Sequence, residues 1–358
     1  MSSIADSTVH LRSGTEPREA SIAAIRIWLY CVAGLIFAMV LVGGATRLTN
    51  SGLSITEWQP IMGALPPMSA ADWHDAFEKY KQIPEYQLFN KGMSLEAFKR
   101  IYWWEWSHRL LGRFIGVAFF VPLLIFWIRG AIPRRLAPKL FAIFLLGGAQ
   151  GALGWYMVES GLAVRTDVSQ YRLAAHLSLA VLIYGAILWV AYGARERAGP
   201  ARAGDVPGVL KATAGGLVCL LFLQIILGGF VAGTDAGLSH NTWPLMDGAI
   251  IPDGLGVMQP WYLNLFENVL TVQFDHRMVA YTIALLAAAH LHLSWRYDAE
   301  AAKPLAFAVA AAVVAQITLG IFALLTQLEI GLALAHQAGA ILLFALVLYQ
   351  LHVLTRRA

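Results

Sequence analysis

Long apolar stretches alternate with short polar ones along this chain. Eight of them reach or nearly reach the roughly 20 residues that cross a bilayer as a helix. They cover residues 22–42, 110–128, 140–158, 173–190, 209–231, 279–293, 305–325 and 332–354. Backbone polar groups in lipid must be satisfied within their own segment, so runs of this length favour helices over barrel strands. We therefore expect an all-α integral membrane protein with eight transmembrane helices.

A sequence motif occurs twice, and this repeat organises the chain. Residues 43–54 match residues 228–239, so that Gly43 corresponds to Gly228 with an offset of 185. Later landmarks keep the same order with smaller offsets. They are Ser107-His108-Arg109 with Asp275-His276-Arg277, Ala149-Gln150 with Ala315-Gln316, and Leu173–His176 with Ala333–His336. Four spans return the chain to its starting side, so the repeat predicts two pseudo-symmetric four-helix bundles of parallel topology.

Basic residues set the predicted orientation. Lys and Arg gather before the first span, at the connections that follow spans two, four and six, and at the end of the chain. Such residues are retained on the cytoplasmic side, so both termini should be cytoplasmic. The predicted organisation is a cytoplasmic tail at 1–21, an N-terminal half at 22–194 with a long external loop at 47–100, a cytoplasmic linker at 195–208 and a C-terminal half at 209–358. Acidic residues in the first 20 positions argue against a mitochondrial transit peptide, which leaves a bacterial inner membrane.

Composition narrows the function classes. Apolar residues make up 58% and charged residues only 13%, whereas a soluble domain carries about 25% charged residues. The net charge of +4 is explained by the cytoplasmic loops and does not indicate nucleic acid. The two cysteines, Cys31 and Cys219, fall within apolar spans. The sequence therefore predicts neither an external disulfide framework nor a CxxC redox motif.

Four histidines occupy matching places in the two halves. His108 and His276 come early in spans two and six, and His176 and His336 come early in spans four and eight. A single histidine of this kind is most simply an interhelical hydrogen-bonding residue. Four at repeat-equivalent places favour ligands facing the bundle interior. The remaining histidines of the spans and loops lack repeat mates, and we expect loop or interfacial positions for them; they are His74, His240, His290, His292 and His352.

The surroundings of these histidines favour a heme over a compact metal site. Carboxylates and thiolates are scarce near them, whereas small residues such as Gly147, Gly148, Gly151, Gly154 and Gly320 are frequent. A zinc ion needs three or four close ligands. A flat macrocycle held axially by imidazole suits this pattern better.

The two halves differ at chemically informative positions. Glu105 precedes His108 by three residues and can share its helix face, whereas the matching position beside His276 is Gln273. This difference suggests that the first half performs chemistry and the second only binds. An acid that caps the helix start is an equally good explanation of Glu105 at this point.

Three arginines are candidate anchors for heme propionates. Arg109 and Arg277 follow putative ligands in both halves, and Arg47 is matched by Ala232. Charge-assisted hydrogen bonds would favour such pairs. For Arg47, a side chain that snorkels to the membrane edge is the simpler alternative.

Five segments together resemble the heme A synthase family, from about residue 22 to the end. They read GGATRLTNSGLSITEW, EWSHR, VSQYRLAAHLS, FDHRM and LAHQAGA. The resemblance implies an oxidoreductase that converts the C8 methyl group of heme O to a formyl group, giving heme A for cytochrome oxidase. It implies that His108 and His176 flank the substrate heme, that Glu105 is essential, and that His276 and His336 ligate a heme b cofactor.

The same resemblance also implies which molecules this protein binds. It implies lipid, heme O and the heme O synthase that supplies it as partners, while the electron acceptor stays open and a homo-oligomer is compatible with the sequence. Some bacterial relatives carry external cysteine pairs, and their absence here indicates the mitochondrial-type branch.

Two other function classes are alternatives. A two-heme cytochrome b that carries electrons from quinol would need two equivalent sites, which the Glu105/Gln273 difference disfavours. A transporter with parallel repeats would be expected to show Gly or Pro breaks in mid-membrane, which the spans lack.

Overall fold

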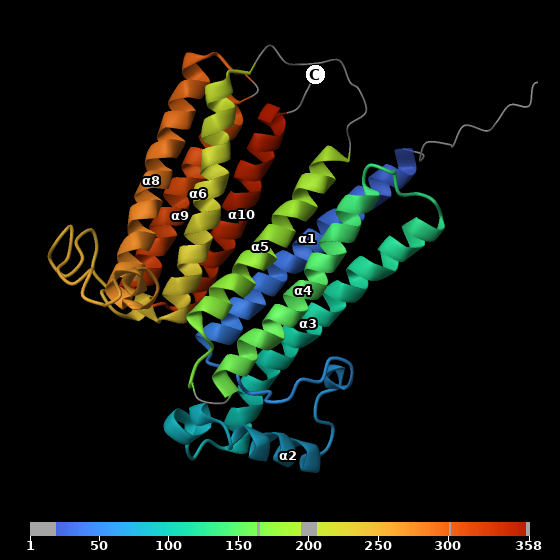
Figure 1. Ribbon diagram of the computed structural model, residues 1–358, viewed down its shortest axis with the longest axis vertical. Coiled ribbons are helices and arrows are strands. Elements are labelled where there is room, and N and C mark those ends of the chain that lie inside the picture. Colours follow the sequence, from blue (N-terminus) through green and yellow to red (C-terminus); the bar gives the residue numbers. More distant parts are fainter. Residues whose placement is uncertain (1–18, 163–164, 195–205, 301, 356–358) are drawn as a thin grey trace, which may run out of the picture.

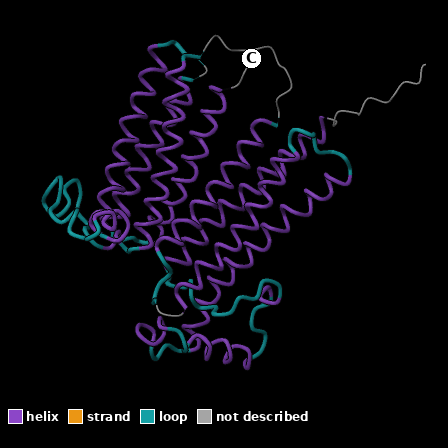
Figure 2. Tube along the Cα trace, viewed as in Figure 1, coloured by secondary structure: helices purple, strands orange, loops and turns teal. Residues whose placement is uncertain are grey.

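The computed structural model describes residues 19–162, 165–194, 206–300 and 302–355. Eight of its helices are long and apolar enough to cross a membrane. They are α1 (Glu19–Leu48), α3 (Leu95–Ile128), α4 (Ala137–Leu162), α5 (Gln170–Gly193), α6 (Gly208–Gly233), α8 (Val269–Arg296), α9 (Lys303–Leu325) and α10 (Ile330–Thr355). Within the described residues the chain forms no strand, and Figure 2 shows helices joined by loops. The predicted all-α protein with eight spans is confirmed.

The eight long helices form a centre and two flanks. Helices α1, α5, α6 and α10 contact one another, α3 and α4 flank α1 and α5, and α8 and α9 flank α6 and α10 (Figure 1). Helix α1 begins and α10 ends at the same end of the molecule. The division into two pseudo-symmetric bundles at 22–194 and 209–358 stays a prediction. The predicted cytoplasmic tail and linker lie mostly outside the described residues.

Small residues let the two halves approach closely. A methyl group added at Gly229 of α6 would lie 3.1 Å from the Cα atom of Ala174, and one added at Gly233 would lie 2.7 Å from the Cα atom of Gln170. Both partners belong to α5. Lipid tails are as apolar as the helix surfaces, so close backbone packing rather than hydrophobicity drives association of membrane helices. The α5–α6 contact therefore joins the halves through these glycines.

The loop between the first two spans has other bounds than the predicted 47–100. Helix α3 begins at Leu95, where the Ser94 side chain accepts a hydrogen bond from the amide of Ala97. The loop therefore spans 49–94 instead of 47–100. It contains a helix that hydrophobic length alone does not reveal, α2 (Ala70–Tyr80), whose start is fixed by a capping box between Ser69 and Asp72.

Shorter elements complete the external segments. In the first half these are η1 (Met62–Ala64) and η2 (Tyr86–Asn90), and in the second half η3 (Ala236–Leu238), η4 (Trp261–Leu263) and α7 (Asn264–Glu267).

A proline lies inside α3, and a tryptophan of α1 compensates for it. Pro122 has no amide hydrogen, so the carbonyl of Ala118 loses its helical donor. The indole Nε1 of Trp28 donates to this carbonyl at 2.8 Å. Helix α3 therefore continues through the proline while all of its buried carbonyls near this point keep a partner.

Trp28→Phe should consequently destabilise the protein by about 1 kcal/mol, because the carbonyl of Ala118 is left without a donor in an apolar environment. Thermal unfolding of the protein in detergent measures the effect. Trp127→Phe is the matched control, since Trp127 is 60% exposed on the same helix as Ala118. An unchanged midpoint for Trp28→Phe would show that the bond contributes nothing.

The expected loop or interfacial position is wrong for two histidines. His290 is fully buried: its Nδ1 lies 2.6 Å from Oγ1 of Thr213, and its Nε2 lies 2.9 Å from Nε2 of Gln350. His352 is 5% exposed and its ring packs against Trp189. Polar partners on neighbouring helices allow an imidazole to be buried in a span. Repeat matching gives no signal here, because the contacts of His290 lie within the second half and the contact of His352 with Trp189 joins the two halves.

Candidate functional site

The four repeat-matched histidines lie on four different long helices. His108 is on α3, His176 on α5, His276 on α8 and His336 on α10. Within each half the two imidazoles are close enough for a charge on one to act on the other. The structure therefore brings together His108 with His176 and His276 with His336.

Each of these imidazoles packs against a glycine of a neighbouring helix. A methyl group added at Gly154 would lie 2.9 Å from Cε1 of His176, and one added at Gly320 would lie 2.8 Å from Cε1 of His336. The same relation holds for the other pair. A methyl group added at Gly43 would lie 3.2 Å from Nε2 of His108, and one added at Gly228 would lie 3.5 Å from Cε1 of His276. Room for the ring therefore requires glycine at Gly154 and Gly320, whereas the contact at Gly228 is an ordinary one.

Two glutamines donate hydrogen bonds to the backbone carbonyls of the histidines on α5 and α10. Nε2 of Gln150 donates to the carbonyl of His176 at 3.0 Å, and Nε2 of Gln316 donates to the carbonyl of His336 at 2.8 Å. Nδ1 of His336 lies 3.2 Å from the carbonyl of Gln316. Donation from Nδ1 to that carbonyl leaves Nε2 free to bind a metal, the arrangement usual for histidine ligands. The repeat comparison had marked both glutamines as landmarks but had assigned them no role.

Buried polar atoms without partners gather beside the histidines of the second half. Among the described residues these include Nδ1 of His276, Oε1 of Gln224, Oε1 of Gln316, and Nε and Nη1 of Arg277. Unsatisfied buried groups are costly and suggest a bound group. Two unused guanidinium donors suit a carboxylate such as a heme propionate. The described residues contain no cluster of three or more metal-ligating side chains. Two nearby imidazoles, glycines packed against them and unpaired guanidinium donors fit a heme that these residues would hold.

Glu105 is buried deep in the first half. It is 2% exposed, and its Oε2 accepts hydrogen bonds from Oγ of Ser54 at 2.8 Å and from the amide of Ile55 at 2.7 Å. Its Oε1 accepts from Nε and Nη2 of Arg109 at 3.0 and 2.5 Å. All of these groups donate, which suits a carboxylate. The alternative of a helix cap is wrong, because Ser94 caps α3 well before this position.

In the second half the uncharged Gln273 makes hydrogen bonds similar to those of Glu105. Nε2 of Gln273 donates to the carbonyl of Ala236 at 2.6 Å, and its Oε1 accepts from Nη2 of Arg277 at 2.8 Å. In each half the arginine also donates to the loop that follows the half's first long helix. Arg277 reaches the carbonyl of His240 at 2.9 Å, and Arg109 reaches that of Ile55 at 2.7 Å. Ile55 and His240 differ by the repeat offset of 185.

The three candidate propionate anchors differ in how many of their guanidinium nitrogens already donate to other protein groups. Arg109 uses Nε and Nη2 on Glu105 and Nη1 on the carbonyl of Glu57 at 3.0 Å. Arg277 keeps Nε and Nη1 unpaired. Arg47 donates from Nη2 to Asp235 at 2.8 Å and to the carbonyl of Ala232 at 3.2 Å. Arg47 thus links the first half to the second.

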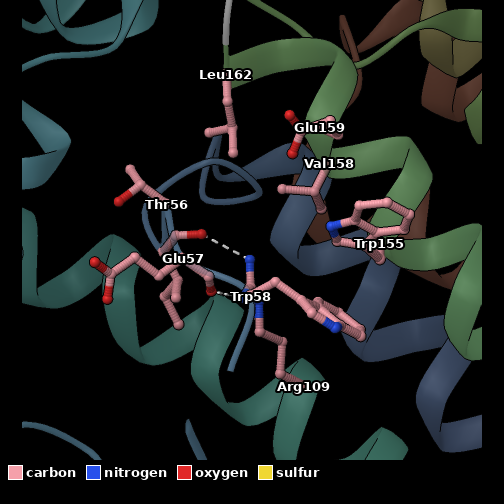
Figure 3. Close-up of a pocket in the computed structure, with 9 residues that line it drawn as sticks. Thr56, Glu57, Trp58, Arg109, Trp155, Val158, Glu159 and Leu162 are labelled. Atoms are coloured by element: carbon pink, nitrogen blue, oxygen red, sulfur yellow. Dashed lines mark hydrogen bonds between the residues drawn. The ribbon is translucent and has the colours of Figure 1, made fainter. Parts of the chain in front are cut away.

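A small pocket opens where the loop after α1 meets α3 and α4 (Figure 3). Arg109 reaches into it from α3 and donates to the carbonyls of Ile55 and Glu57. Trp155 and Glu159 of α4 form its other side.

An apolar groove of about 330 Å³ lies on α3 around the turn that carries His108. Its lining residues are Trp106, Ser107, Leu110, Leu111 and Phe114. Helices α3 and α4 contact each other sparsely, whereas α8 and α9 pack along each other. The first half is therefore the more open of the two.

Comparison with known proteins identifies the family. The profile of a family described as cytochrome oxidase assembly protein matches residues 26–348. A heme A synthase of Parvibaculum lavamentivorans is 53% identical over 345 residues, which cover 95% of this chain and 97% of the relative. A heme A synthase of Azorhizobium caulinodans is 57% identical over 321 residues, covering 89% and 90%, and one of Bradyrhizobium diazoefficiens is 54% identical over 336 residues, covering 93% and 92%. This chain, with its repeat-matched histidines and its buried Glu105, belongs to the heme A synthase family.

Proposed function

We propose that this protein oxidises the C8 methyl group of heme O to a formyl group and so forms heme A for cytochrome oxidase. One observation supports placing this reaction in the first half. Glu105 is a buried carboxylate one helical turn from His108, whereas Gln273 takes its place beside His276. A protein with two equivalent heme sites for electron transfer needs no such difference, which argues against the two-heme cytochrome b alternative.

The substrate heme O belongs in the first half. His108 and His176 would hold it, each packed against a glycine, Gly43 and Gly154 respectively. The apolar groove beside His108 and the sparse contact between α3 and α4 give the prenyl tail access to an apolar environment, where its burial is favourable.

The second half would hold the heme b cofactor. His276 and His336 are its ligands, Gln316 orients His336 and Arg277 meets a propionate. When bound, a heme b supplies one-electron redox chemistry close to the substrate half.

Glu105 would act on the substrate through its fixed negative charge. The Ser54 hydroxyl, the Ile55 amide and Arg109 hold both carboxylate oxygens in place. A carboxylate fixed in this way can stabilise positive charge that develops on the methyl carbon, or it can accept a proton that this carbon loses. Fixed charges in a site of low polarity act without reorganising.

The sites would lie near the external face of a bacterial inner membrane. Arg26, Arg129, Lys211 and Arg296 lie towards the end of the molecule where α1 begins and α10 ends, and such residues mark the cytoplasmic side. Both termini are then cytoplasmic. Heme O would arrive from the heme O synthase within the same membrane.

Heme extraction tests the proposed function. The protein is produced in cells that make heme O but lack heme A, and the extracted hemes are separated by chromatography and identified by mass spectrometry. We expect heme A to appear only with the protein present, together with heme b in the purified protein. Heme b alone, with heme O unchanged, would favour the simple cytochrome.

A glycine substitution tests the placement of the substrate. Gly154→Ala places a methyl group 2.9 Å from Cε1 of His176, which must displace the imidazole. Overpacking of this kind costs about 1–3 kcal/mol, so heme A formation should fall by roughly tenfold, because 1.4 kcal/mol corresponds to a factor of ten. Gly151→Ala, one turn away with open space around it, is the control. Equal activities of the two variants would place the substrate elsewhere.

A further inference from the structure

The contact between α1 and α10 corresponds in the repeat to the contact between α6 and α5. Gly44 of α1 matches Gly229 of α6 with the offset of 185, and Gln337 of α10 matches Leu177 of α5 with the same offset of 160 that relates the histidines directly before them. A methyl group added at Gly229 would lie 3.6 Å from Cδ2 of Leu177, whereas one added at Gly44 would overlap Oε1 of Gln337. The same place is therefore apolar in one contact and polar in the other.

The side chain of Gln337 makes a hydrogen bond from one half of the chain to the other. Its Nε2 donates to the backbone carbonyl of Val40 at 3.0 Å. Val40 is buried on α1, one helical turn before Gly44. Hydrophobic burial gives membrane helices little preference for one arrangement, so polar side chains that bond across helices help to select it. The leucine at the matching place on α5 cannot make such a bond.

This hydrogen bond lies between the two histidine sites. Gln337 directly follows His336, the proposed ligand of heme b. Gly44 directly follows Gly43, where an added methyl group would lie 3.2 Å from Nε2 of His108. The bond therefore joins the helix that carries a heme b ligand to the helix that packs against the histidine of the substrate half.

The position of His336 is thus fixed from two sides. From α9, Nε2 of Gln316 donates to the backbone carbonyl of His336 at 2.8 Å, and Nδ1 of His336 lies 3.2 Å from the carbonyl of Gln316. These contacts orient the imidazole within the second half. From α1, the bond to Gln337 fixes the backbone next to this imidazole relative to the first half.

We propose that Gln337 is a positioning residue that sets the place of His336, and with it of heme b, relative to the substrate half. The inference rests on the proposed function, because that function assigns heme b to His336 and the substrate to His108. Gln337 acts through the backbone of α10 and takes no part in making or breaking bonds of the substrate. The residue after His176 is Leu177, so the helix that meets the exchanging substrate lacks this link.

Two substitutions remove the hydrogen bond. Gln337→Met keeps the length of the side chain without its donor, and Gln337→Leu introduces the residue of the other half. Both should bind a normal amount of heme b but form heme A about fivefold more slowly or worse, the factor that corresponds to one lost hydrogen bond, because α10 then occupies its productive position less often. The electron paramagnetic resonance g values of ferric heme b respond to the orientation of the axial imidazoles and should shift.

A second pair of substitutions tests the same contact from α1. Gly44→Ala displaces the Gln337 amide and should reproduce the effects of Gln337→Met. Gln337→Ala removes the amide and leaves room for the added methyl group, so Gly44→Ala should have no further effect on heme A formation in that background. Gly34→Ala, on the same helix with open space around it, is the control and should match the wild type.

The measurements are heme A formation in heme O-producing cells and the spectra of the purified proteins. A normal rate or unchanged g values in both Gln337→Met and Gln337→Leu would overturn the positioning role. Loss of heme b from both would also overturn it, because Gln337 would then be needed for binding the heme and not for its place. Additive effects of Gly44→Ala and Gln337→Ala would contradict it as well. A wild type that forms no heme A would refute the proposed function, while the g values would still test how His336 is positioned.

Discussion

Proteins with His276→Ala or His336→Ala are expected to lose the visible absorption bands of heme b, whereas His108→Ala should retain them. Each substitution in the second half removes one of the two imidazoles, on α8 and α10, that would ligate the heme. The remaining imidazole would leave the iron with one protein ligand fewer. The amide of Gln316 and the free donors of Arg277 would then lack the group that satisfies them.

The measurement is the reduced-minus-oxidised spectrum of the purified variants. His292→Ala is the matched control, since His292 is an exposed residue of α8 and its loss should leave the bands intact. Bands that survive in both His276→Ala and His336→Ala, or bands that vanish in His108→Ala, would reverse the assignment of the two halves.

Glu105→Gln is expected to lower heme A formation by about 10² to 10³-fold while the heme b spectrum is unchanged. This range is typical when one preorganised electrostatic group is removed from an active site. Glutamine is close to glutamate in size and still accepts from Ser54, so packing is preserved while the negative charge is lost. The substitution also gives the first half the residue that the second half carries at Gln273.

Extracted hemes from cells that supply heme O give the readout. Glu96→Gln, at an exposed position on the same helix, should behave as the wild type. A Glu105→Gln protein that still forms heme A at the normal rate would remove Glu105 from the mechanism and would revive the view that it is only structural.

Much of the fold and part of the candidate site follow from the sequence. Span length predicts the eight helices, because a helix of about 20 apolar residues is the simplest structure that crosses lipid with its backbone satisfied. The repeat then selected His108, His176, His276 and His336, since side chains at matching places in two copies are expected to meet matching surroundings. The Glu105/Gln273 difference came from the same comparison.

Helix boundaries and burial could not be predicted in the same way. The spans are apolar on all sides, so hydrophobic periodicity does not tell which face of a helix turns inward. The burial of His290 was therefore missed. Helix α3 starts at Leu95 because Ser94 caps it, and α2 forms outside the membrane, where hydrophobic length gives no signal.

The sequence by itself determined the eight spans, the duplication and the histidine pairs, because these depend on residue type and spacing along the chain. Only the tertiary structure decided which groups hold Glu105, that Arg47 binds Asp235 across the halves, and that Glu85 is buried in the loop between α1 and α3. These facts depend on how helices rotate and approach one another. That geometry depends on residues such as Gly229 and Gly233, whose lack of a side chain permits close contact with residues far away in the sequence.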